Sequence, residues 1–110
     1  MQINNIQSSF DQIYFDHNFL VMIESHLTYL KTVGNVRLTE VSNHQNYKFE
    51  GDLFGLLDDL HVPKNFHYIT ARVNGYENSA DFQGDKQYLL LPDGNEIEQL
   101  KTIYQTKNNL

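Results

Sequence analysis

The clearest hydrophobic periodicity in the chain lies between residues 16 and 33, where apolar side chains recur at helical spacing. The residues that follow this spacing are Phe19, Ile23, Leu27 and Leu30. Because a helix turns once in about 3.6 residues, the spacing predicts a helix from about Asp16 to Val33. Asp16 is placed as its N-cap, and Gly34 is placed to end it in a left-handed conformation.

The apolar surface of this predicted helix is wider than one stripe, because Val21 and Met22 extend it. Two interpretations stay open: the helix packs only on its own domain, or it also docks on another chain. The candidate residues for such a subunit interface are Phe15, Phe19, Val21, Met22, Tyr29 and Tyr104. Residues 1–11 are rich in Gln, Asn and Ser, and they predict an arm that a partner would order.

A strand is predicted from Asn35 to Val41, where apolar and polar residues alternate imperfectly. In this strand Val36 and Leu38 are expected to face inward. The following "SNHQN" is expected to form a turn. "YKF", Tyr47 to Phe49, is predicted to be extended and is a second candidate for the first strand.

Two helices are predicted in the middle of the chain. In "EGDLFGLLDDLHV" one helical face is formed by Leu53, Phe54, Leu57 and Leu60. Asp52 is placed to cap the exposed amides at the start of this helix. Pro63 suits the first turn of a second helix, because its missing N–H would have no partner there. The face of the second helix is formed by Phe66, Ile69, Thr70 and Val73, before Asn74-Gly75 ends it.

A short apolar strand and a last helix are predicted near the C-terminus. The strand runs from Gln87 to Leu91, and Pro92 stops its pairing because proline has no N–H to donate. Asn95 and Glu98 form a pattern like a capping box, which starts the last helix. The apolar stripe of that helix is Ile97, Leu100 and Tyr104.

Composition narrows the classes of protein that fit. A chain of 110 residues predicts one domain with a modest core. A net charge of −6, with scattered cations, argues against sequence-independent binding to nucleic acid. "MQINNIQSSF" lacks the basic start and apolar stretch of a secretory signal, and "FLVMI" is too short to span a bilayer. We therefore expect a soluble protein without Sec export and without a membrane partner.

No cofactor, metal or catalytic residue is predicted. The chain has no cysteine, and none of its five histidines has a second one four residues away, the spacing of a helical zinc site. Asp58 and Asp59 are adjacent on a predicted helix, so their side chains diverge by about 100° and cannot converge on one substrate atom. No serine lies in a Gly-x-Ser-x-Gly setting. We therefore expect a protein that is not an enzyme.

The middle of the chain resembles the LysM domain, a small β-α-α-β module with two antiparallel strands. The likeness is carried by "EGDLFGLLDDLHVP", by "RVNGY" with its asparagine near the end of the second helix, and by the closing "DFQGDKQYLLLPD". The resemblance implies an α+β fold, with an N-terminal and a C-terminal helix added. It divides the chain into an arm and helix (1–34), a LysM-like domain (35–92) and a last helix (93–110).

A second, narrower likeness indicates the kind of assembly to which the protein would belong. "NFHYITARVNGY" resembles the aromatic-rich second helix of LysM-like tail and baseplate proteins of contractile bacteriophages. This implies a structural virion protein that joins subunits of the baseplate, or of the junction between tube and baseplate, through protein–protein contacts. Its partners would be other tail proteins, in multiple copies around a symmetric ring, and it would be assembled in the host cytoplasm.

The alternative implied by the same family is a peptidoglycan-binding LysM module. In that family the sugar groove lies between the loop that opens the first helix and the loop before the last strand. The matching candidate residues, for a glycan or a partner, are Gly51, Asp52, Leu53, Phe54, Asn78, Ser79, Ala80 and Asp81. The sequence departs from the family after Gly51-Asp52, because the common Thr or Ser is replaced by Leu53.

Overall fold

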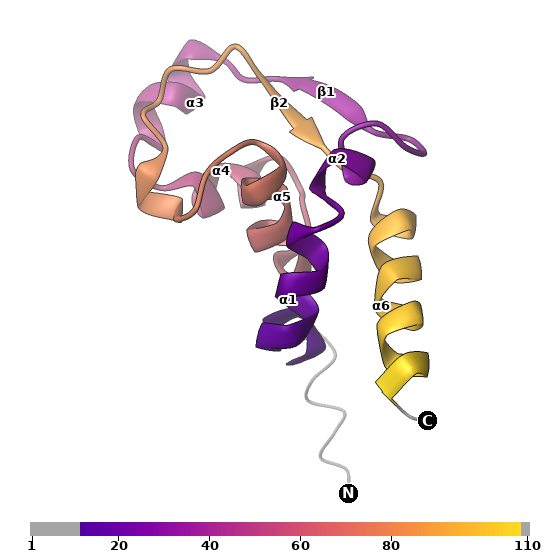
Figure 1. Cartoon of the computed structure of the whole chain (residues 1–110). Helices are drawn as coiled ribbons and strands as arrows, with labels where there is room; N and C mark the ends of the chain where they lie inside the picture. Colours follow the sequence, from indigo (N-terminus) through magenta and orange to yellow (C-terminus); the bar gives the residue numbers. More distant parts are fainter. Residues whose placement is uncertain (1–11, 109–110) are drawn as a thin grey trace, which may run out of the picture.

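The computed structural model describes residues 12–108, so the predicted arm of residues 1–11 lies outside it. The described part is a mixed α+β structure of six α-helices, short 3-10 turns and one sheet (Figure 1). Its elements are η2 (Gln12–Phe15), α1 (His17–Glu24), α2 (Leu27–Leu30), β1 (Arg37–Glu40), α3 (Asn43–Lys48), α4 (Leu53–Asp59), η3 (Lys64–Phe66), α5 (His67–Val73), η4 (Ser79–Asp81), β2 (Tyr88–Leu91) and α6 (Gly94–Asn108).

The two strands pair antiparallel, with Arg37 opposite Leu91 and Glu40 opposite Tyr88. The first strand is therefore the central part of the segment predicted from 35 to 41. The other candidate, Tyr47 to Phe49, was wrong as an extended segment, since Tyr47 lies in α3. The predicted second strand is confirmed to within one residue.

The prediction that Leu38 faces inward was wrong: this side chain is 65% exposed. Side chains alternate along a strand, and the buried residues next to β1 are Val41 on its own segment and Leu89 on β2. Thr39 lies opposite Leu89, so the odd-numbered residues of β1 face the core. Leu38 lies opposite Leu90, on the other face of the sheet.

The turn predicted after β1 is instead a helix, α3, which adds an element to the expected strand–helix–helix–strand order. A capping box starts it: the Gln45 N–H donates to Ser42 Oγ at 3.0 Å, and the Ser42 N–H donates to Gln45 Oε1 at 2.9 Å. These two hydrogen bonds satisfy amides that the first turn of a helix leaves free.

The predicted N-terminal helix is broken in two. Asp16 caps α1, as predicted, but α1 ends at Glu24 and α2 ends at Leu30. At the break, Ser25 Oγ donates to the Met22 carbonyl at 2.7 Å, and His26 Nδ1 bonds the same oxygen at 2.8 Å. Such side-chain bonds to the backbone compete with the helical ladder.

The predicted ends of the first and last helices were also placed wrongly. Gly34 has φ +68°, as expected, but it lies beyond the end of α2 and therefore does not cap it. The cap of α6 is Asp93, not Asn95. Its Oδ1 accepts from the Asn95 N–H at 2.9 Å, and its Oδ2 accepts from the Asn35 N–H at 3.0 Å. The bond from Asn35, and then that from Asn95, lower the pKa of Asp93.

The core consists of two clusters. The first lies beneath the sheet and is formed by Val41, Leu53, Leu56, Leu57, Val62, Ala71, Phe82, Leu89 and Leu91. The second joins the terminal helices to α5 and is formed by Tyr14, Phe19, Ile23, Leu30, Ile69, Val73, Ile97 and Leu100. Helix α5 contributes to both clusters, through Ala71 on one side and through Ile69 and Val73 on the other.

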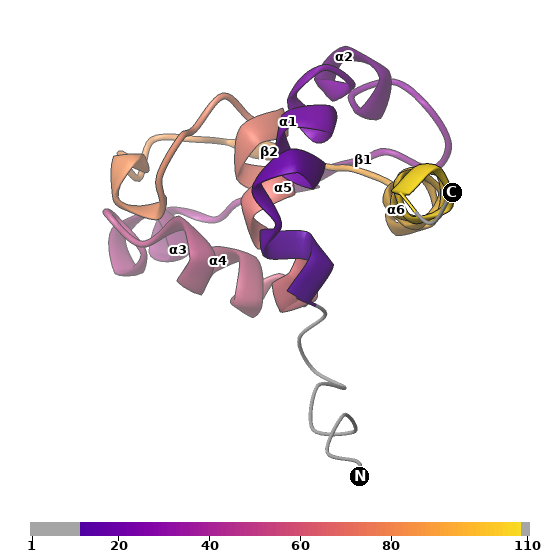
Figure 2. The ribbon, with the colours of Figure 1, turned by 60° about the horizontal axis from the view of Figure 1, so that its bottom comes forward.

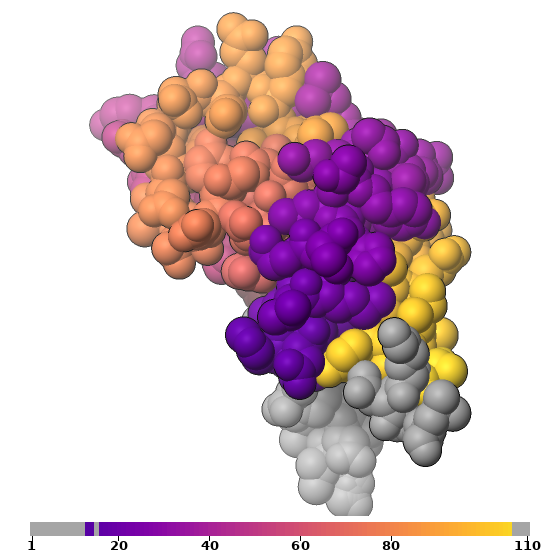
Figure 3. All heavy atoms as spheres, in the orientation of Figure 1, coloured from indigo at the N-terminus to yellow at the C-terminus, as the bar shows by residue number. Residues whose placement is uncertain are grey.

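The arrangement of the helices follows from these clusters. Seen along its axis, α6 lies on one side of α5, whereas α3 and α4 lie on the other (Figure 2). The N-terminal segment lies across α5 and α6 (Figure 3). The start of α1 and the end of α6 lie at the same end of the molecule, opposite the sheet (Figure 1). The segments 12–34, 35–92 and 93–108 therefore share core contacts.

Asn74 fixes the outer edge of β2. Its Oδ1 accepts from the Leu90 N–H at 2.8 Å, and its Nδ2 donates to the Leu90 carbonyl at 2.8 Å. Nδ2 also donates to the Thr70 carbonyl at 2.8 Å, one turn back in α5. A single side chain therefore replaces the hydrogen bonds of a neighbouring strand. This gives a physical reason for the asparagine that follows α5.

We predict that Asn74→Asp lowers the free energy of unfolding by about 2 kcal/mol, because the Leu90 carbonyl loses its donor and the Thr70 carbonyl keeps only the backbone N–H of residue 74. The control is Asn95→Asp, the same change at an exposed position, which should stay within about 0.5 kcal/mol of the wild type. Urea unfolding followed by circular dichroism measures both. Equal stability of the two variants would show that Asn74 does not hold the strand.

Candidate functional site

The two segments predicted to form a groove do lie side by side. The Phe54 N–H donates to Ser79 Oγ at 2.9 Å, which joins the start of α4 to η4. The Gly51 N–H donates to the Phe82 carbonyl at 2.8 Å, immediately after η4. The fold therefore brings together residues that are 25 and 31 positions apart in sequence, as the resemblance implied.

Many polar groups of these segments are already used within the chain. Asp52 Oδ1 accepts from the Gly55 N–H at 3.0 Å and caps α4. Asp81 accepts from the Asn78 N–H at 3.2 Å in a second capping box. A side chain at Gly55 would collide with the Asp52 carboxylate, so a larger residue there would force this cap to shift.

The remaining candidates differ in accessibility. Leu53 is fully buried in the first cluster and cannot contact a ligand in this fold. Phe54 and Ser79 are half-buried. The exposed residues are Gly51, Asp52, Asn78, Ala80 and Asp81. The surface between the two segments therefore consists mainly of small and acidic residues.

A hollow of about 330 Å³ lies beside this surface, between α4 and the start of α5. It is lined by Phe54, Gly55, Asp58, Lys64, Asn65, His67 and Tyr68, and most of its wall is apolar. At its rim, Lys64 Nζ lies 3.7 Å from Asp58 Oδ1, in an exposed ion pair of small energetic weight. The wall of the hollow therefore offers mainly apolar and aromatic contact.

His67 is the one histidine of the described chain that is buried, with 7% of its surface exposed. Its Nε2 donates to the Val62 carbonyl at 2.8 Å, since a carbonyl can only accept. Val62 is positioned by the end of α4, where its N–H donates to the Leu57 carbonyl. Burial lowers the pKa of His67, and nearby Lys64 lowers it further, while the Val62 bond and Asp58 act in the opposite direction.

We predict that stability falls as the pH is lowered from about 6.5, the ordinary pKa of histidine. The unfolded chain takes up a proton at His67 before the folded chain does, because the folded pKa is depressed. The loss should continue down to that folded pKa.

Chemical denaturation at pH 7 and pH 5 checks this, with His67→Gln compared with His44→Gln, a change at an exposed histidine. The His67 variant should lose part of the pH dependence, and the His44 variant should keep it. Identical pH slopes in both variants would contradict the assignment.

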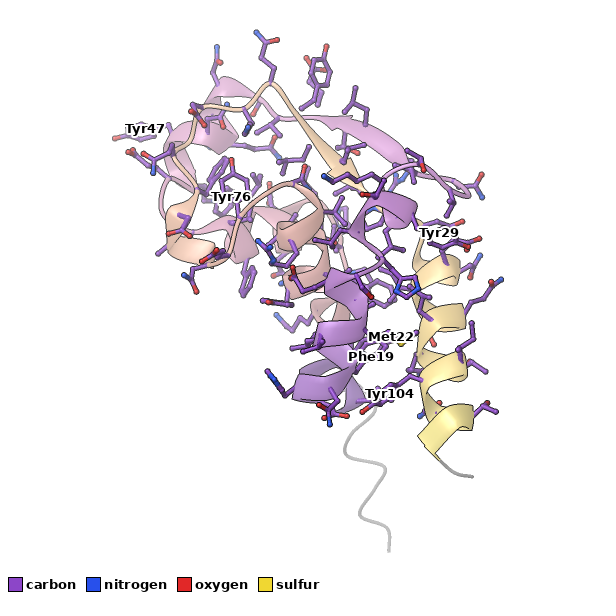
Figure 4. The ribbon with its side chains drawn as sticks, viewed as in Figure 1. Phe19, Met22, Tyr29, Tyr47, Tyr76 and Tyr104 are labelled. Atoms are coloured by element: carbon purple, nitrogen blue, oxygen red, sulfur yellow. The ribbon has the colours of Figure 1, made fainter. Side chains whose placement is uncertain are left out.

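The predicted interface residues separate into two groups. Phe19 is fully buried between α1 and α6, and Met22 and Tyr104 are half-buried beside it (Figure 4). The structure therefore places Phe19 in the core of this chain, where no neighbour can reach it. Val21 and Tyr29 are 53% and 43% exposed. The side chain of Phe15 lies outside the described part.

Tyrosine–carboxylate hydrogen bonds hold α6 against the N-terminal segment. Tyr104 donates to Asp16 at 2.6 Å at one end of α6, and Tyr29 donates to Glu96 at 2.7 Å at the other. Tyr14 donates to Glu98 between them. The bond to Asp16 raises the pKa of Tyr104, and the bond to Glu96 raises that of Tyr29. These pairs set α1 and α6 antiparallel.

We predict that Phe19→Ala lowers the free energy of unfolding by about 3–5 kcal/mol, because it leaves a cavity in the second cluster. Val21→Ala, two residues away on the exposed side of the same helix, should change it by less than about 0.5 kcal/mol. Thermal or urea unfolding of the isolated chain measures both. A small effect at Phe19 would show that α1 is not held by the core.

Other charged groups form structural pairs. Arg72 binds Glu24 through Nε at 2.5 Å and Nη2 at 3.0 Å, and the hydrogen bond from Arg72 lowers the pKa of Glu24. Asp58 and Asp59 diverge, since Asp59 accepts from Gln45 Nε2 at 3.0 Å.

Within residues 12–108 no group of three or more His, Cys, Asp or Glu could hold a metal ion. No described helix is long and apolar enough to cross a bilayer.

Comparison of the chain with protein-family models, with curated protein sequences and with solved structures finds no significant match. The site is therefore interpreted from its own geometry. Sequence reasoning placed Leu38 inward and did not identify the exposed face that it shares with Tyr88. Three consecutive leucines in β2 gave no alternation that would identify its buried face, which the structure assigns to Leu89 and Leu91.

Proposed function

We propose that this chain is a non-enzymatic structural protein of a contractile phage tail. In this proposal a LysM-like central unit joins neighbouring subunits of the baseplate, or of the junction between tube and baseplate, through protein–protein contacts. The antiparallel pair β1–β2 around α4 and α5 is compatible with such a unit. The additional helix α3 and the terminal helices elaborate it.

The observation that carries the proposal is an apolar face on the sheet. Leu38 is 65% exposed and Tyr88 is 50% exposed, and both lie on the face that also carries Leu90. Large apolar side chains next to each other on a surface are typical of protein–protein contacts, and tyrosine is enriched in them. Tyr47, which is 84% exposed and points outward from α3, adds a further aromatic contact (Figure 4).

Glycan binding is the second candidate, and the closeness of Gly51–Phe54 to Ser79 favours it. Against it, the polar side chains there already cap helices, as Asp52 does for α4. Sugar hydroxyls would then find few free partners, and an unpaired polar group costs about 1–3 kcal/mol when it is buried. We therefore rank protein–protein contact first.

We predict that the chain, co-expressed with baseplate and tube proteins of a contractile tail, is recovered in complex with at least one of them. The double variant Leu38→Asp/Tyr88→Asp should weaken this recovery about tenfold or more, because it places charges in the apolar face. Ile103→Asp, a matched change at a residue of α6 that is 50% exposed, should leave it unchanged.

Sedimentation with purified peptidoglycan distinguishes glycan binding from the proposed structural role. The proposal expects the chain to stay in the supernatant. Co-sedimentation that is lost in Asn78→Ala/Asp81→Ala, together with no capture of any tail protein, would replace the structural role by glycan binding.

A further inference from the structure

The proposed function assigns a role to one face of the sheet but none to the free edge of β1. The Val41 N–H donates to the Gln87 carbonyl at 2.8 Å, so the ladder uses the odd-numbered residues of this segment. In an antiparallel pair the residues between them direct their N–H and C=O groups away from the partner strand. The backbone groups of Leu38 and Glu40 therefore point outward from the sheet.

The two edges of the sheet are treated differently. On β2 the outward groups of Leu90 are both satisfied by Asn74. On β1 the outward groups of Leu38 and Glu40 have no hydrogen-bond partner within residues 12–108. In Figure 1 β1 forms the outer border of the molecule. An unpaired edge beside exposed apolar side chains is a template for a further strand.

We propose that β1 pairs antiparallel with β1 of a second copy of this chain, which produces a continuous four-stranded sheet around a two-fold axis. The inference rests on the proposed function, whose copies meet in one assembly, and it names the contact between two of them. An extended strand is the occupant because its backbone carries donors and acceptors at the spacing of Leu38 and Glu40, whereas one side chain such as that of Asn74 serves a single residue.

The side chains favour a second copy and select one register. With Leu38 opposite Leu38 of the second copy, the leucines at positions 90 and 38 form a row of four across the joined sheet. Glu40 then lies opposite Val36. Of the two neighbouring symmetric registers, one places Glu40 opposite Glu40, where like charges destabilise a sheet. The other places Leu38 opposite Glu40 and so separates the leucines. The Leu38–Leu38 register is the one that keeps the leucine row, and it has the symmetry of a two-fold contact.

The first test is Glu40→Pro. Proline removes an N–H that makes no bond to β2 and places its ring on the outer edge, so the β1–β2 ladder is retained while the added strand is blocked. By symmetry two intermolecular hydrogen bonds are lost. Sedimentation equilibrium should show a wild-type dimer and a dissociation constant at least about tenfold weaker in Glu40→Pro. Glu40→Gln, which keeps the N–H, should remain dimeric.

The second test does not depend on the folding of the proline variant. The chain has no cysteine, so Leu38→Cys introduces a single thiol. In the proposed register the two Cα atoms lie about 5.5 Å apart, a distance that a disulfide spans. Under mild oxidation this variant should form a disulfide dimer at least about tenfold faster than Tyr47→Cys, whose side chain is also exposed.

The outcomes distinguish this contact from the proposed function. A wild-type chain that is monomeric up to about 1 mM, or equal rates for the two cysteine variants, would overturn the pairing of two copies. A dimer that persists in Glu40→Pro would place the contact elsewhere. If the chain is monomeric but Glu40→Pro loses recovery with a tail protein, the strand comes from that protein, the proposed function stands, and the two-copy contact is wrong.

Discussion

The contact between Asn74 and Leu90 is the interaction on which the rest of the structure depends. It fastens β2 to the end of α5 through both backbone groups of one residue. β1 is held in the sheet by β2, and Asp93, two residues after β2, then ties the entry of β1 to the start of α6. A polar side chain thus sets the position of an apolar sheet. Its three hydrogen bonds are directional and act together with the burial of Leu89 and Leu91, which specifies the face that β2 turns to the core.

Helix α5 connects the sheet to the helices near both termini. It is short, yet one side packs beneath the sheet and the other packs against α1 and α6. The apolar stripes of the terminal helices are therefore largely buried inside the chain. Phe19, a predicted interface residue, lies in the second cluster, whereas Val21 and Tyr29 of the same segment stay exposed. Helix α5 buries residues on opposite sides, which a pattern for a single face does not reveal.

The sequence predicted the features that are set by interactions between residues close together in the chain. Helical spacing found α4, α5 and α6, and the caps at Asp16 and Asp52 were recognised because a short acidic side chain before an apolar run has one common use. The inward face of β1 was missed, since parity is set by the partner strand and not by Leu38 itself. The break after Glu24 was missed because Ser25 and His26 both bond one carbonyl. For the candidate site, the sequence predicted that the loops 51–54 and 78–81 lie close together. It did not predict the hydrogen bonds between them, because these depend on tertiary contacts.

The placement of α1 and α6 has a mechanical consequence. The start of α1 and the end of α6 lie at one end of the molecule, and the sheet lies at the other (Figure 1). Three tyrosine–carboxylate hydrogen bonds join α6 to the N-terminal segment between these two poles. A load applied between the start of α1 and the sheet would therefore be shared between the N-terminal segment, which is broken at Ser25, and the continuous helix α6.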